Sequence, residues 1–237
     1  MSAAGGSPRP TRPDGAPTAR GAARRRPLAM RDLVLLVVLG VVFGFLYWVL
    51  VQAWTALSIA MGPAGDLAQH VLFGGWLLVA PLAVAILRRP GVGILAELLA
   101  AVIEVVFLGS PVGPLLLIAG FLQGLGSELP FALGRYRSFG WVRFAVSGLL
   151  GASLVFFWSA FRFGWYGQDL LLLRFGIQAL SGVLLGGLVA KVIVDALLRT
   201  GVLASFPIAA ASRSAASAGS TAPGGGAGDP DLVRRER

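Results

Sequence analysis

Six long apolar runs dominate the chain, and short polar stretches separate them. They cover residues 32–52, 67–87, 92–108, 112–133, 142–163 and 170–198. A helix needs about 20 apolar residues to cross the ~30 Å hydrocarbon core of a bilayer. The pattern therefore predicts an all-α integral membrane bundle of six transmembrane helices over residues 31–199. The third run is short and flanked by glycine, so we expect it to be less tilted or broken.

The segments on either side of the bundle differ in composition. Residues 1–30 are rich in Pro, Gly, Ala and Arg, and residues 200–237 in Ala, Ser and Gly. Both have too little apolar surface to offset the entropy of ordering, which predicts two disordered tails. The arginines at 24–26 resemble a twin-arginine export signal, but the following run exceeds the roughly 7–15 residues of a cleavable signal core. We expect it to be retained as the first helix.

Composition agrees with a membrane protein. Hydrophobic residues make up 56% of the chain and charged residues 13%, compared with about 25% charged in soluble domains. The net charge of +9 could indicate nucleic-acid binding, but the arginines lie beside apolar runs, so we predict no nucleic-acid partner. The absence of cysteine excludes disulfides, thiolate metal sites and cysteine nucleophiles.

The arginines also predict the orientation in the membrane. Residues near helix ends that are positively charged stay in the cytoplasm, and most of the arginines fall on one predicted side: Arg24, Arg25, Arg26, Arg31, Arg88, Arg89, Arg135, Arg137, Arg143 and Arg199. Both termini are therefore expected to be cytoplasmic. The chain has no G-x-x-x-x-G-K-[ST] motif, so energy for any transport must come from another protein.

Polar side chains inside the apolar runs are the candidate functional residues, because they are costly in hydrocarbon. Glu97 and Glu104 are seven residues apart and share one helical face. We interpret Glu104 and Gln123 as substrate contacts. Glu97 and Glu128 can serve either the substrate or the packing, and Glu128 has Arg135 and Arg137 as alternative partners.

Two further polar residues and several aromatic residues lie toward the outer side. We list His70 and Gln178 as substrate contacts, with capping as the alternative role of the histidine. Most aromatic residues on the outer side are typical of the belt at a membrane interface. We predict that Trp54 and Trp158 stack on a flat heterocycle, and that Tyr47 has either a substrate-binding or a structural role. Carboxylates below such faces would suit an amino-substituted pyrimidine.

Glycine pairs with four-residue spacing predict close helix contacts. They are Gly40 and Gly44, Gly120 and Gly124, and Gly182 and Gly186. Such pairs let helix backbones approach closely. Packing within the bundle explains them, but the first pair has docking onto a partner protein as an alternative.

One stretch resembles a known family. Residues 109–139, GSPVGPLLLIAGFLQGLGSELPFALGRYRSF, with GVGILAELLAAVIEVV just before them, resemble the YkoE-type substrate-binding (S) components of energy-coupling factor (ECF) transporters. The resemblance implies a multi-pass protein of the bacterial plasma membrane that captures hydroxymethylpyrimidine (HMP) or thiamin. It also implies a transmembrane coupling subunit and two cytoplasmic ATPases as partners. Family members often carry an Ala-x-x-x-Ala docking patch, whose counterpart here is Gly40 and Gly44.

Two other classes of function were considered. A small-solute channel or facilitator fits six helices with inward carboxylates. An intramembrane hydrolase is less consistent, because a metal site needs several ligands and the chain has one histidine. The prediction is a transport subunit that is not an enzyme and uses no metal or cofactor.

Overall fold

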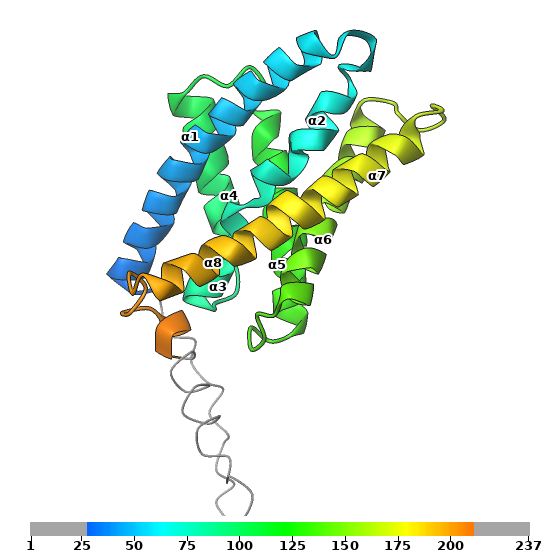
Figure 1. Ribbon diagram of the computed structural model, residues 1–237. Coiled ribbons are helices and arrows are strands. Elements are labelled where there is room, and N and C mark those ends of the chain that lie inside the picture. Colours follow the sequence, from blue (N-terminus) through cyan, green and yellow to red (C-terminus); the bar gives the residue numbers. More distant parts are fainter. Residues whose placement is uncertain (1–27, 211–237) are drawn as a thin grey trace, which may run out of the picture.

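The computed structural model describes residues 28–210, which form a bundle of helices without a strand. The α-helices are α1 (Met30–Ala60), α2 (Leu67–Leu72), α3 (Val79–Leu87), α4 (Val92–Val102), α5 (Leu115–Leu133), α6 (Trp141–Arg162), α7 (Leu171–Ser181) and α8 (Ala190–Arg199). In Figure 1, α1 and the run from α7 to α8 slant across the more upright α5 and α6. The predicted all-α fold is confirmed for this part of the chain. The tails at 1–27 and 211–237, where disorder was predicted, lie outside the described residues.

Five stretches of the described chain are long and apolar enough to cross a membrane. They are Met30–Ala60, Leu67–Leu87, Leu115–Leu133, Trp141–Arg162 and Leu171–Arg199. The sixth predicted span, residues 92–108, forms α4 and a π-helical continuation, Ile103–Phe107. The 11 residues of α4 and the five of the continuation extend about 24 Å, which is shorter than the other spans.

Two of the long spans are interrupted at their middle. A 3₁₀ segment, Phe73–Leu77, joins α2 to α3, and a π-helical segment, Gly182–Val189, joins α7 to α8. The two segments pack against each other. Gly74 allows this approach, because a side chain there would overlap the carbonyl of Ser181. Uniformly apolar sequence gave no sign of either interruption.

Side chains of other helices satisfy the backbone beside the 3₁₀ segment. Backbone N–H groups in a membrane interior need a hydrogen-bond acceptor within the protein. Three of them donate to side chains: Gly74 to Ser181 Oγ at 2.9 Å, Val79 to the Tyr47 hydroxyl at 3.2 Å, and Ala80 to Glu97 Oε1 at 3.3 Å. The interruption is therefore held by α1, α4 and α7.

Gly40 and Gly44 lie between α1 and α4, inside the bundle. A methyl group at Gly40 would lie 2.7 Å from Leu99 Cβ, and one at Gly44 would lie 2.7 Å from Ile103 Cβ. Of the two roles left open for this pair, the geometry favours packing within the bundle, because α4 of this chain covers the glycine face. The predicted packing role of the other pairs is confirmed: Gly120, Gly124, Gly182 and Gly186 all face backbone or side chains of neighbouring helices.

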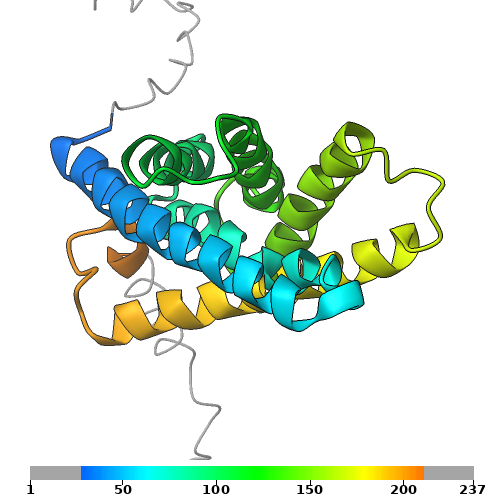
Figure 2. The same cartoon turned by 90° about the horizontal axis from the view of Figure 1, so that it is seen from above.

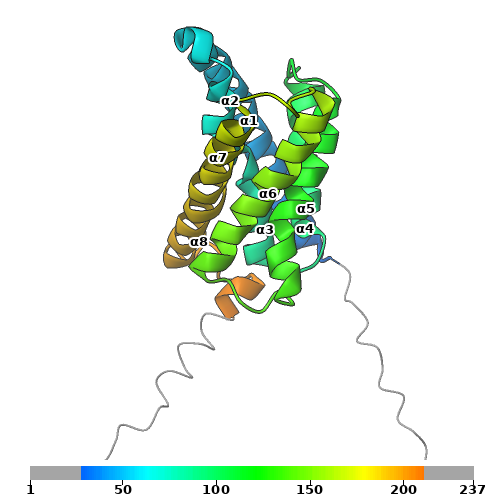
Figure 3. The ribbon, with the colours of Figure 1, turned by 90° about the vertical axis from the view of Figure 1, so that its right-hand side faces the viewer.

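The first and last described residues lie at the same end of the bundle. Figures 2 and 3 show α1 beginning, and the short helical turn after α8 lying, at the end opposite to the connection between α6 and α7. Residues 200–210 are not separate from the bundle, since Leu203 and Ile208 are buried in its main apolar cluster. The ordered domain thus extends about a dozen residues past the predicted boundary at 199.

Candidate functional site

A cavity of about 170 Å³ lies between α1, the α2–α3 span, α5 and α6. It is in the half of the bundle near the α6–α7 connection, because Phe163 at the end of α6 and Val112 just before α5 contribute to its wall. Its aromatic lining residues are Trp54, Phe73, Trp76, Trp158 and Phe163, and its polar ones are Gln69, Gln123 and Ser159. No ionisable side chain is among these lining residues.

Gln123 is the most deeply buried polar residue of the cavity wall. Its residue is 5% exposed, and its side-chain amide forms no hydrogen bond with another described residue. An amide offers two donor hydrogens and an acceptor oxygen, and a buried amide without partners costs free energy. Both the donor and the acceptor of this amide are therefore available to a ligand in the cavity.

Flat π surfaces make up much of the remaining wall. Trp54 comes from α1 and Trp158 from α6, so both predicted stacking residues reach the cavity. Trp76 comes from the 3₁₀ segment and was not predicted. Rings of this kind bind planar heterocycles by stacking and attract cations to their faces.

Glu104 lies behind the cavity wall and is not one of its lining residues. It is fully buried, and Ser110 Oγ donates a 2.8 Å hydrogen bond to its Oε1, while Oε2 has no partner. Ala101, one turn earlier on α4, packs against the lining residues Leu116 and Ala119. The predicted contact between Glu104 and the substrate therefore requires a shift of this wall.

Glu97 and Tyr47 hold helices together. The Tyr47 hydroxyl donates to Glu97 Oε1 at 3.3 Å, and the same oxygen accepts the backbone N–H of Ala80. The pair joins α1, α4 and the start of α3, and neither residue lines the cavity. Of the two roles left open by the sequence, the geometry favours packing.

Glu128 joins α5 to the start of α4 and to the connection between α5 and α6. Its carboxylate accepts the backbone N–H groups of Gly91, Gly93 and Ile94 at the start of α4, and the hydroxyl of Tyr136 at 2.7 Å. A carboxylate is stabilised at a helix N-terminus by the partial positive charge there. The alternative ion pair with Arg135 or Arg137 is not formed among the described residues.

His70 and Gln178 contact each other and not the cavity. The His70 Nδ1 and Gln178 Oε1 atoms are 2.7 Å apart, and Gln178 Nε2 donates to the Ala152 carbonyl at 3.0 Å. Neither residue lines the cavity, so their predicted contact with the substrate is not supported by this geometry. Because successive residues of a helix point about 100° apart, the neighbouring Gln69 faces the cavity while His70 faces α7.

Comparison with known proteins identifies the family. Residues 31–154 match the model of the family described as "ABC-type cobalt transport system, permease component". The "Putative HMP/thiamine permease protein YkoE" of Bacillus subtilis (strain 168) is 31% identical over 176 residues, which cover 73% of this chain and 86% of that protein. A solved structure described as "Crystal structure of an S-component of ECF transporter" matches with a TM-score of 0.74 and 28% identity, over 84% of this chain and 100% of the other.

The chain belongs to the S components of ECF transporters. This S component is a multi-pass protein of the cell membrane and a transport protein. Its cavity combines predicted residues (Trp54, Gln123, Trp158) with residues that the sequence analysis missed (Gln69, Phe73, Trp76, Phe163). The tryptophan at 76 was hidden because it lies within an apolar run and not at a helix end. Gln69 was not predicted, because no sequence signal distinguished it from the adjacent His70.

Proposed function

We propose that this S component captures thiamin or its pyrimidine precursor HMP in the aromatic cavity and delivers it inward with a coupling subunit and two ATPases. The unpaired amide of Gln123 in the cavity wall is the observation that carries the proposal. The names of the similar proteins, an HMP/thiamine permease and an ECF S component, agree with it.

The aminopyrimidine ring suits this cavity. Its ring nitrogen and its amino group form an acceptor next to a donor, the same edge that a Gln amide recognises bidentately in adenine. Gln123 can pair with this edge while the tryptophans cover the ring faces. Thiamin adds a thiazolium cation without N–H donors, which needs no carboxylate and is attracted by the faces of tryptophan rings.

We propose six membrane crossings with both termini in the cytoplasm. An even number of crossings agrees with the described ends lying together (Figure 3), and α4 with its π-helical continuation supplies the sixth. The basic residues of the connections support the direction by the positive-inside rule: Arg88, Arg89, Arg135 and Arg137 lie at the end of the bundle opposite to the cavity. The cavity then opens to the outside.

Titration of the purified protein with thiamin and with HMP, without nucleotide, tests the proposal. Tryptophan quenching is a suitable readout, because three tryptophans line the cavity. Gln123→Ala should weaken binding roughly 5- to 100-fold, since it leaves the buried polar edge of the ligand unpaired. Gln52→Ala is the matched control, because Gln52 is exposed and outside the cavity. Binding of neither compound at millimolar concentration, or unchanged affinity of Gln123→Ala, would refute it.

A further inference from the structure

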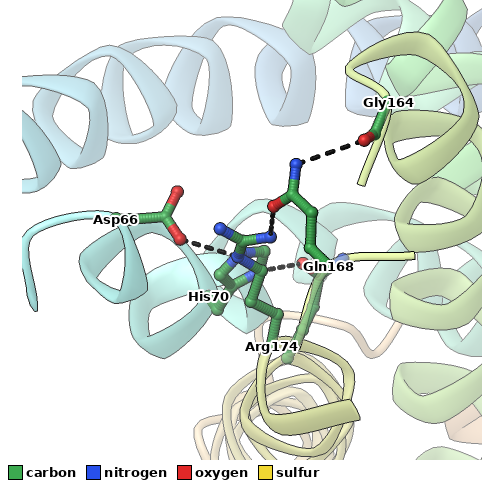
Figure 4. A network of polar contacts seen from close by, with 6 residues as sticks. Asp66, His70, Gly164, Gln168 and Arg174 are labelled. Atoms are coloured by element: carbon green, nitrogen blue, oxygen red, sulfur yellow. Dashed lines mark hydrogen bonds and ion pairs between the residues drawn. The ribbon is translucent and has the colours of Figure 1, made fainter. Parts of the chain in front are cut away.

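A buried arginine lies between the start of α2 and the connection from α6 to α7. Arg174 of α7 is 8% exposed. Its Nε donates to Asp66 Oδ2 at 2.7 Å, and its Nη1 donates to Gln168 Oε1 at 2.6 Å (Figure 4). Its guanidinium carbon lies 5.3 Å from the ring centre of Trp165. One side chain thus holds two separate segments of the chain together.

Each of the two segments is next to a residue that lines the cavity. Trp165 stacks on Phe163 with ring centres 5.7 Å apart, and Phe163 lines the cavity. On the other side, Asp66 precedes Gln69, which lines the cavity, by three residues. Gln168 also donates to the Gly164 carbonyl at 3.2 Å, which closes residues 164–168 into a compact turn (Figure 4).

Water reaches the partners of Arg174 but not the neighbouring contact of α7. The side chain of Asp66 is 49% exposed and Gln168 is exposed, so water can replace either partner. One turn further along α7, the His70–Gln178 contact is fully buried and also reaches α6. Gly164 and Gly167 have φ values of 67° and 87°, which glycine adopts without strain. Residues 163–170 are also held through Trp165, whose ring centre lies 5.3 Å from that of His70 and 5.8 Å from that of Phe156. Water therefore reaches the polar contacts between this segment and Arg174, while Gln178 stays buried between α2 and α6.

We propose that Arg174 is a positioning residue of the cavity entrance. It holds residues 163–170, and with them Phe163, against α2, and the entrance opens when its bonds to Asp66 and Gln168 exchange with water. This inference rests on the proposed function, because an entrance is needed only if the cavity takes up a substrate. Its test does not require the substrate.

Accessibility of a single cysteine in the cavity tests the proposal. The chain has no cysteine, so Ser159→Cys gives one thiol in the cavity wall. Its rate of reaction with a small water-soluble methanethiosulfonate is measured alone and together with Arg174→Gln or Gln168→Ala. Arg174→Gln should raise the rate about tenfold or more, because it removes two charge-assisted hydrogen bonds. Gln168→Ala should raise it less, and Arg174→Lys, which keeps the ion pair, should lie between Arg174→Gln and the parent.

The matched control breaks a different ion pair. Asp195→Asn removes the Lys191–Asp195 pair of α8, which is remote from the cavity, and it should leave the rate unchanged. If Arg174→Gln fails to fold, Gln168→Ala decides, since it changes an exposed side chain only. Rates equal to that of the parent in the folded variants would overturn the proposal, and so would an equal increase with Asp195→Asn.

The same variants distinguish this proposal from failure of the proposed function. If the parent binds thiamin or HMP, opening the entrance should raise association and dissociation rates together and leave Kd nearly constant. A purely structural role of Arg174 would instead change Kd without raising cysteine reactivity. If neither compound binds, the proposed function fails, while the cysteine rates still decide the role of Arg174.

Discussion

Buried polar side chains of α5 differ in whether the protein supplies their partners. Glu128 accepts hydrogen bonds from three backbone N–H groups and one tyrosine hydroxyl, whereas Gln123, more than one turn earlier, has none from the described residues. A group whose bonding capacity is filled stabilises the fold. A buried group whose capacity is empty is available to a ligand.

Glu128→Gln should therefore destabilise the protein and leave vitamin affinity unchanged. The amide replaces one acceptor oxygen with an NH₂ group that faces N–H donors, which should cost about 1–3 kcal/mol of stability. Thermal unfolding in detergent measures the loss, and Tyr136→Phe, which removes one donor, should show a smaller one. Loss of affinity as large as that of Gln123→Ala would place Glu128 in the site instead.

The sequence predicted which kinds of side chain line the cavity better than it predicted which way individual side chains point. Gln123 was identified as an amide within an apolar run, and Trp54 and Trp158 as aromatic residues near predicted helix ends. Gln69 and His70 are adjacent, so the choice between them depends on the rotation of α2, which is set by its contacts with α7. The apolar spacing of a uniformly hydrophobic helix carries no information on that rotation.

The glycine pairs mark the places where helices pack closely, but the role of each pair depends on which helix packs against it. The four-residue spacing predicted a close approach along α1, but it could not tell a helix of the same chain from a partner protein. The structure supplies α4 as the neighbour. The 3₁₀ interruption was also unpredictable, because the hydrogen bonds that hold it come from Tyr47, Glu97 and Ser181, residues far away in sequence.

Gly44→Ala should destabilise the bundle, while Gly176→Ala should not. The new methyl group at Gly44 would lie 2.7 Å from Ile103 Cβ and 2.8 Å from the Ala100 carbonyl, whereas Gly176 has nothing within 4 Å. Overpacking of this kind costs about 1–3 kcal/mol. A helical glycine in open surroundings instead gains about 0.5–1 kcal/mol as alanine. Thermal unfolding of both variants checks the difference, and equal stability would mean that α1 and α4 are not in close contact.

The described residues form a bundle with an aromatic cavity, and the sequence has no G-x-x-x-x-G-K-[ST] motif. Five of the six apolar runs form stretches long and apolar enough to cross a membrane, and the third forms α4 with its short π-helical continuation. The length and apolar character of the runs were sufficient to predict an all-α membrane bundle, because a bilayer requires long apolar segments whose backbone groups are paired internally. The order at residues 200–210 escaped prediction, since it depends on the packing of Leu203 and Ile208.

Uptake of radiolabelled thiamin or HMP into proteoliposomes tests whether this chain is a binding subunit whose transport is driven by partner proteins. The protein is reconstituted alone, and also together with a coupling subunit and two ATPases. Each preparation is measured with and without ATP on the side of the membrane where the ATPases bind. We predict accumulation with the partners and ATP and none for the protein alone, because the proposed role of the chain is to bind the vitamin and not to drive its movement. Equilibration of the vitamin across the membrane by the protein alone would contradict it and would indicate a channel or facilitator.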